Sequence, residues 1–197
     1  EAVMPLIHVD TLEIEIGYSL TRLADSRVGG DLPDRVSSTR RQIAVELGFV
    51  MPSVRIRDNS ELQPNQYVIK VRGEDVTKAE AHPDKVLAIN SGAVLGPVAG
   101  INTTEPVFGL EAVWIDPGLR EQAERNGFTV VEPSAMIATH LAEIVKIYAA
   151  ELLTRQDVST LLDNAKETNE TVVTELVPNV VQIGDVQKVL QHLLRER

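Results

Sequence analysis

Residues 32–58, LPDRVSSTRRQIAVELGFVMPSVRIRD, decide the fold because the spacing of their apolar side chains changes from a helical period to a strand period. In the first part, apolar side chains recur at every third or fourth position, Pro33 stands in the first turn, and Gly48 ends the pattern. These signals predict an amphipathic helix over 32–47. Residues 54–58 then alternate between apolar and polar side chains, which predicts a half-buried strand.

Two further alternating segments lie on either side of this helix and strand. Residues 12–16 read Leu-Glu-Ile-Glu-Ile and end at Gly17, and residues 66–72 alternate in the same manner. Turn-forming residues at 58–59 and 63–65 separate the two strands that follow the helix. The order strand, helix, strand, strand predicts a mixed unit of an α+β protein.

A second, smaller α/β unit is predicted later in the chain. Residues 85–90 and 110–115 have the composition of strands, a short helix is expected at 118–126, and a β-rich stretch follows at 128–131. Residues 91–107 between the first two strands are rich in glycine, proline, asparagine and threonine, so they are interpreted as a long loop. Loops of this length in compact domains are usually functional or mobile.

From residue 133 onward, the apolar side chains recur with the period of a helix. The first helix is expected to have about five turns. Thr154 or Asp157 opens a second helix, and a third begins at Asp185. The apolar stripe of the last helix reaches the end of the sequence without a cap, so we expect the helical segment to continue beyond Arg197 in a longer protein.

The composition indicates a globular chain and leaves proteins open as partners. Of its 197 residues 43% are hydrophobic, enough for one large domain or two to three small ones. The absence of cysteine excludes a disulfide framework, thiolate catalysis and a cysteine zinc site. A net charge of −10, with no basic cluster longer than Arg40-Arg41, disfavours nucleic acid and anionic lipid. No apolar run approaches the about 18–20 residues that cross a bilayer, so these residues carry no membrane segment.

No arrangement of catalytic or metal-binding residues stands out. The four histidines lie far apart and form no H-x-x-x-H or H-E-x-x-H pair, so no metal site is predicted: they are His8, His82, His140 and His192. His140 lies beside an apolar stripe and is interpreted as a hydrogen-bonded structural residue. Ser134, His140 and Asp157 have the residue types of a triad, but no nucleophile-elbow motif surrounds the serine.

Nucleotide binding is weakly supported, and no cofactor is expected. Gly92, Gly96 and Gly100 follow a strand, but they lack the G-x-G-x-x-G spacing and the P-loop lysine, and no helix opens after them. An enzyme with an unrecognised site in the 91–107 loop is one alternative function.

Phe108 is a candidate binding residue because it is one of only three phenylalanines and follows the long loop. Two interpretations compete. Large apolar residues are usually inside, which favours Phe108 as a core residue that starts a strand. In the other interpretation, Phe108 lies in an apolar hollow between two subdomains, where a partner's aromatic or leucine side chain could anchor.

Several collinear segments resemble the FHIPEP family, the export-gate proteins of bacterial flagellar and virulence type III secretion. The clearest are Arg40-Arg-Gln-Ile-Ala-Val-Glu-Leu-Gly-Phe49 and Pro52-Ser-Val-Arg-Ile-Arg-Asp-Asn59. The resemblance continues through most of the chain, at 62–65, 108–115, 127–131, 138–141, 151–156 and 189–194. The segments at 29–32 and 62–65 are more similar to the flagellar branch than to the virulence branch.

The resemblance implies a domain organisation. A first α/β subdomain would comprise 1–83 and 133–152, with a smaller α/β subdomain inserted at 84–132. A helical third subdomain would begin at 153 and be incomplete at 197, and a fourth would be missing. A membrane half would precede a linker near residue 1, so the chain would be the cytoplasmic portion of a bacterial inner-membrane protein.

The resemblance also implies a function without catalysis or a cofactor: a docking platform for export chaperone–substrate complexes, assembled as a nine-membered ring. Other export components, an ATPase complex and an export switch protein, would be further partners. Partner-binding positions would be Phe108 as the apolar anchor, Glu105 as a charge on the rim, and Thr139 as a hydrogen-bonding or small-residue wall. The family usually has aspartate at the position of Glu105, which bears on partner specificity.

Gly17 matches a glycine that supports conformational change in the family, although an ordinary turn glycine is an equal interpretation. The alternative to the docking function is a structural, ring-forming segment of a virulence-type export gate.

Overall fold

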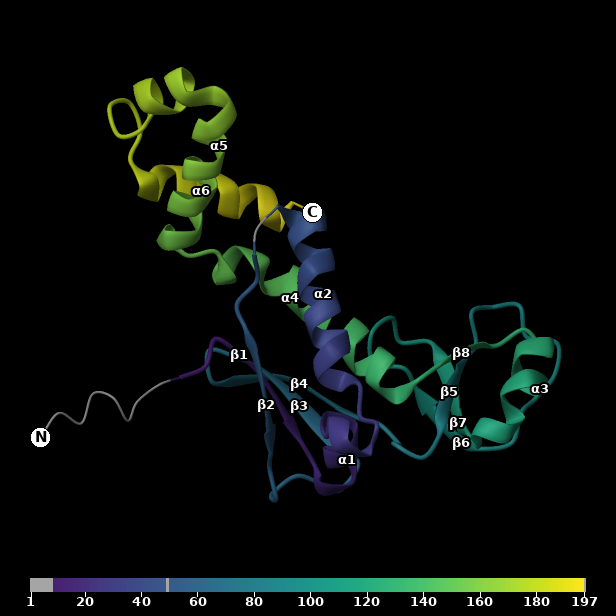
Figure 1. Ribbon diagram of the computed structural model, residues 1–197. Helices are drawn as coiled ribbons and strands as arrows, with labels where there is room; N and C mark the ends of the chain where they lie inside the picture. The colour runs from purple at the N-terminus through teal and green to yellow at the C-terminus, as the bar shows by residue number, and fades with distance from the viewer. Residues whose placement is uncertain (1–8, 49, 197) are drawn as a thin grey trace, which may run out of the picture. The chain divides into compact units, whose positions relative to one another are not determined.

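The computed structural model describes residues 9–48 and 50–196 (Figure 1). This part of the chain divides into two compact units, one formed by 9–39 and 53–141, the other by 40–48, 50–52 and 142–196. The first unit holds two β-sheets, and the second consists of helical segments and their connections. The predicted α+β class is therefore confirmed.

The first sheet has four strands in the order β2-β1-β3-β4. These are β1 (Leu12–Ile16), β2 (Val54–Asp58), β3 (Gln66–Val71) and β4 (Glu74–Glu80). β1 runs parallel to β2 and antiparallel to β3. Because parallel neighbours need a crossover connection, the segment that contains helix α2 joins β1 to β2.

Helix α2 (Leu32–Leu47) has the bounds that the sequence predicts. It ends where Gly48 adopts φ +76°, a left-handed conformation that favours glycine and closes many helices. The stretch between β1 and α2 forms three short elements that the sequence did not predict: η2 (Tyr18–Leu20), α1 (Thr21–Ala24) and η3 (Ser26–Val28).

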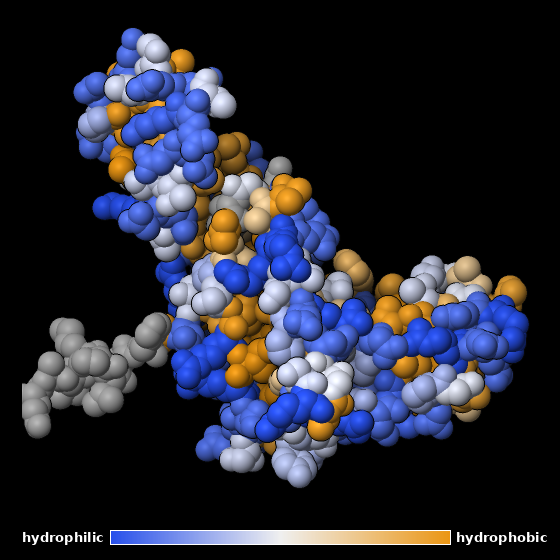
Figure 2. All heavy atoms as spheres, viewed as in Figure 1, coloured by the Kyte–Doolittle hydropathy of each residue, from blue (hydrophilic) through white to orange (hydrophobic). Residues whose placement is uncertain are grey.

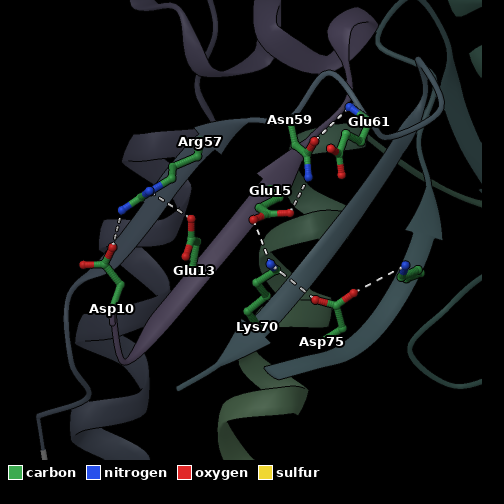
Figure 3. A network of polar contacts seen from close by, with 9 residues as sticks. Asp10, Glu13, Glu15, Arg57, Asn59, Glu61, Lys70 and Asp75 are labelled. Atoms are coloured by element: carbon green, nitrogen blue, oxygen red, sulfur yellow. Dashed lines mark hydrogen bonds and ion pairs between the residues drawn. The ribbon is translucent and has the colours of Figure 1, made fainter. Parts of the chain in front are cut away.

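One side of the first sheet is a charged face, because alternate side chains of a strand point to opposite sides. Leu12, Ile14 and Ile16 are buried on the inner side. On the other side, Lys70 Nζ donates to Glu15 Oε1 at 2.8 Å, and Asn59 Nδ2 donates to Glu15 Oε2 at 2.7 Å (Figure 3). The charged face consists of Glu13, Glu15, Arg55, Arg57, Lys70, Asp75 and Lys78.

Glu15 is the best-supported charge of this face. Burial acts to raise its pKa, but the hydrogen bonds from Lys70 and Asn59 outweigh burial, so the pKa of Glu15 lies below its ordinary value. A carboxyl whose pKa is lower in the folded state stabilises the fold above its unfolded pKa, and this stabilisation is lost as the pH falls through the folded pKa.

We expect Lys70→Met to lower the free energy of unfolding at pH 7 by about 1 kcal/mol, because it keeps the apolar stem but removes the cation from Glu15. The difference from the wild type should shrink in acid, below the ordinary glutamate pKa of about 4.3. Urea unfolding at pH 7 and pH 3 measures both effects. Lys78→Met is the control, since Lys78 is more exposed than Lys70 and forms its ion pair with Asp75 rather than with Glu15. Equal losses in the two variants, or a loss independent of pH, would contradict the assignment.

The second sheet has the order β6-β7-β5-β8, and all its neighbours are antiparallel. Its strands are β5 (Val86–Ile89), β6 (Ile101–Thr104), β7 (Glu111–Ile115) and β8 (Thr129–Val131). The turn η4 (Pro117–Leu119) and helix α3 (Arg120–Arg125) connect β7 to β8. Ala123 of α3 packs with Val86, Ala88 and Ile115 in one hydrophobic cluster, which holds α3 on this sheet.

Three long helices follow: α4 (Pro133–Leu152), α5 (Arg155–Leu176) and α6 (Ile183–Arg195). Both predicted start residues of α5 take part in one capping box, because Thr154 Oγ1 accepts from the Asp157 amide at 3.1 Å and the Asp157 carboxylate accepts from the Thr154 amide at 2.8 Å. Helix α6 starts two residues before Asp185, which was predicted as its first residue. Asp185 is instead the third helical residue, and its carboxylate accepts from the Gln182 amide.

Two strands were missed. β4 follows a turn at Arg72 and Gly73, both with positive φ, and β6 lies inside the predicted loop 91–107. The predicted domain boundaries at 84 and 133 remain a prediction. Within the described residues, no helix combines the length and apolarity needed to span a bilayer.

Candidate partner-binding site

An open hollow of about 260 Å³ lies in the first unit, where the segment after β6 meets β5, β8 and the first turns of α4. Figure 2 shows apolar side chains, in orange, at the surface over this part of the molecule. We call it the apolar hollow, and its lining residues are Ile89, Ser91, Glu105, Val107, Phe108, Leu110, Thr129, Val131, Ala135, Met136 and Thr139. The three predicted partner-binding residues therefore line one hollow.

Phe108 lies at the surface of this hollow and is 70% exposed. The interpretation of Phe108 as a core residue is therefore wrong. The reason is the turn that carries it: Gly109 adopts φ +71°, and its amide donates to the carbonyl of Glu105 at 3.2 Å. The chain reverses before β7 begins and leaves the ring of Phe108 outside the sheet.

Glu105 is buried, with 2% of its surface exposed, so its predicted place as a charge on the rim is wrong. Its carboxylate accepts three backbone hydrogen bonds: Oε2 from Val107 at 2.9 Å, and Oε1 from Phe108 at 2.5 Å and from Leu110 at 3.3 Å. Its own amide donates to the carbonyl of Leu110 at 2.9 Å. The charge is satisfied by the chain itself, although Glu105 still lines the hollow.

Thr139 is exposed on α4, and its hydroxyl donates to the carbonyl of Ala135 at 2.9 Å, one turn earlier. Because the donor is used inside the helix, Thr139 supplies a small wall to the hollow without an unsatisfied donor.

The sequence model of the FHIPEP family matches residues 1–197, the whole chain. This protein belongs to the FHIPEP family.

Similarity to individual FHIPEP proteins extends along the full chain. The flagellar biosynthesis protein FlhA of Bacillus subtilis strain 168 is 46% identical over 197 residues, which are 100% of this chain and 29% of that protein. The chain thus spans less than a third of the length of this curated relative.

Solved structures with the same fold are more distant in sequence. The Chlamydia pneumoniae CdsV protein superposes with a TM-score of 0.78 at 18% identity, over 96% of this chain and 55% of that one. The nonameric EPEC SctV-C structure superposes with a TM-score of 0.68 at 15% identity, over 97% and 56% of the two chains.

In this FHIPEP chain His140, which follows Thr139 on α4, forms a buried polar contact. Its Nδ1 lies 2.7 Å from the hydroxyl of Tyr67, and its Nε2 lies 3.4 Å from the Thr77 hydroxyl. Burial lowers the pKa of His140, while the negative charge of Glu105 opposes that change in part. These contacts agree with the predicted structural role.

Ser134 and Asp157, which have the residue types to form a triad with His140, are both engaged in other hydrogen bonds. Ser134 is buried, and its side chain bonds to Asp31. The Asp157 carboxylate is part of the cap of α5. Among the described residues, no three metal-ligating side chains cluster. His8 and Phe49, which entered the sequence argument, lie outside the described residues.

Gly17 does not line the hollow; it follows β1 and packs directly on another backbone segment. Its amide donates to the carbonyl of Gln66 at 2.8 Å. A Cβ at this position would lie 2.1 Å from the carbonyl oxygen of Gln63 and 2.7 Å from that of Pro64. A residue larger than glycine therefore does not fit, a requirement that the sequence did not reveal. A role in conformational change remains a prediction.

Proposed function

We propose that this chain is a docking platform of a flagellar protein export gate, and that export chaperone–substrate complexes bind at the apolar hollow. The observation that carries the proposal is Phe108, a large aromatic side chain that is 70% exposed beside an open hollow in a chain with few aromatic residues. Exposed aromatic anchors beside pockets are typical of binding hot spots.

The chemistry of the hollow supports a partner's apolar side chain as the group that enters. Apart from Glu105, its lining residues are uncharged, and the Glu105 carboxylate is occupied by backbone amides. An apolar group that enters this space loses water and leaves no charge unpaired.

The comparisons support the flagellar form of this function over the virulence form. The Bacillus subtilis relative at 46% identity is a flagellar biosynthesis protein. The proposal places the chain on the cytoplasmic side of the inner membrane, as part of a larger protein that acts without catalysis. A ring of nine copies, as in the SctV-C structure, would deliver bound substrates to the channel, and an ATPase complex and an export switch protein are its further partners.

Titration calorimetry tests the proposal with an export chaperone bound to its flagellar substrate, both from the source organism of this chain. We expect saturable binding at micromolar concentrations, which is strong enough for capture and weak enough for release. The free chaperone and a virulence-type chaperone–substrate complex are the controls, and both should bind more weakly. A chain that is folded but does not bind the flagellar complex would contradict the docking function.

A further inference from the structure

Glu105 combines two properties that seldom occur together on a surface loop. It is buried, and it carries a carboxylate. Among residues 101–111, Glu105 is the only buried residue. Burial of a charge is costly unless hydrogen bonds replace the lost water. The amides of Val107, Phe108 and Leu110 provide that replacement, so the carboxylate and the loop depend on each other.

The backbone of Phe108 takes part in these hydrogen bonds. Its own amide makes the shortest of the three bonds to Glu105, at 2.5 Å, and the amides on either side of the turn make the other two. Hydrogen bonds to a charged acceptor are stronger than those between neutral groups. Without them, the hydrophobic effect would favour movement of the phenyl ring onto the apolar lining, which would close the hollow.

We propose that Glu105 is a positioning residue of the docking site: its carboxylate holds the 105–110 turn so that Phe108 stays outside and the hollow stays open. In this arrangement the Glu105 carboxylate pairs with the amides of the turn and not with a charge of the partner. The inference rests on the proposed docking function of the hollow, but the order of the turn is measurable without any partner.

A charge on the rim and a positioning carboxylate respond differently to salt. If Glu105 met a cation of the partner, Glu105→Gln would reduce the salt dependence of binding, because salt screens exposed charges. A carboxylate that accepts from the amides of Val107, Phe108 and Leu110 is not available to a cation of the partner. In that case Glu105→Gln weakens binding and leaves the salt dependence unchanged.

The first experiment compares three carboxylate variants by calorimetric titration with the chaperone–substrate complex, between about 0.05 and 0.5 M salt. Glu105→Gln should bind about tenfold more weakly at every salt concentration, since glutamine is uncharged and its amide nitrogen, which cannot accept, replaces one of the two accepting oxygens. Glu105→Asp should stay within about threefold of the wild type, because aspartate accepts from amides two and three positions further on. Glu111→Gln, which removes an exposed carboxylate from β7, should bind within about twofold of the wild type.

The second experiment measures amide hydrogen exchange in the free protein. Exchange at residues 107–110 should be about tenfold faster in Glu105→Gln than in the wild type and nearly unchanged in Glu105→Asp. The amides of β1 serve as the internal reference for global stability.

A fourth variant leaves every charge in place. Gly109→Ala has open space for its Cβ but strains the turn at φ +71°. Gly109→Ala should accelerate amide exchange in the turn. It should also weaken binding severalfold without a change in the salt dependence of binding. This variant tests the proposal if Glu105→Gln does not fold.

Each outcome is decisive. Wild-type exchange in Glu105→Gln, or in Gly109→Ala where Glu105→Gln does not fold, would overturn the positioning role. If Glu105→Gln binds more weakly than the wild type only at low salt, the positioning role is also overturned, and Glu105 is then a charge that meets a cation of the partner. If the wild-type chain does not bind the complex while exchange responds as expected, the docking function fails and the order of the turn still depends on Glu105.

Discussion

Phe108→Ala is expected to weaken binding of the chaperone–substrate complex by about 2 kcal/mol, roughly thirtyfold, without a change in fold stability. The phenyl ring is 70% exposed, so its removal leaves little cavity in the free protein. In the complex, the same truncation removes the largest apolar contact surface at the mouth of the hollow.

Titration calorimetry gives the affinity, and thermal unfolding gives the stability. Leu95→Ala is the matched control because Leu95 is 87% exposed in the same unit and does not line the hollow. We expect wild-type affinity for this control. A folded Phe108→Ala chain that binds as tightly as the wild type would remove the hollow as the docking site.

The second large effect is expected from Gly17→Ala, which should lower the free energy of unfolding by about 3 kcal/mol. The backbone at Gly17 has φ −71°, which alanine adopts easily, so the cost comes from space rather than from conformation. The atoms in the way are the carbonyl oxygens of Gln63 and Pro64, at 2.1 and 2.7 Å from the Cβ position. Both belong to backbone and cannot turn aside as a flexible side chain would.

Urea unfolding measures this loss. Gly118→Ala is the control, since a Cβ there meets nothing within 4 Å and the φ of Gly118 is not in the left-handed region. We expect the control to be neutral or slightly stabilising, because alanine restricts the unfolded chain. If Gly17→Ala is as stable as the wild type but alters partner binding, the steric explanation is wrong and the predicted hinge role gains support.

Prediction succeeded where one segment carries its own signal. The bounds of α2 follow from an apolar stripe, a proline in the first turn and a glycine after the end, all within the helix and its flanks. β1 and β2 were predicted from alternation alone. β4 and β6 were missed because both are edge strands with mostly polar or charged residues, and pairing with β3 and β7 makes them strands.

The candidate site shows the same division. The resemblance to a family brought Glu105, Phe108 and Thr139 together, and the structure places all three around one hollow. The role of Glu105 was not predictable, because a glutamate in a polar loop is usually solvated. The only local signal was that the amides bound by the Glu105 carboxylate belong to residues two to five positions later in the chain.

Local residue order was sufficient to specify the α+β class, the main helices and the lack of catalytic motifs, since periodicity and capping act over neighbouring residues. Contacts between distant segments determined that Glu105 is buried and that Gly17 has no room for a side chain. Burial and close backbone approach depend on which distant segments contact each other in the fold. The spacing of residue types along the sequence does not specify those contacts.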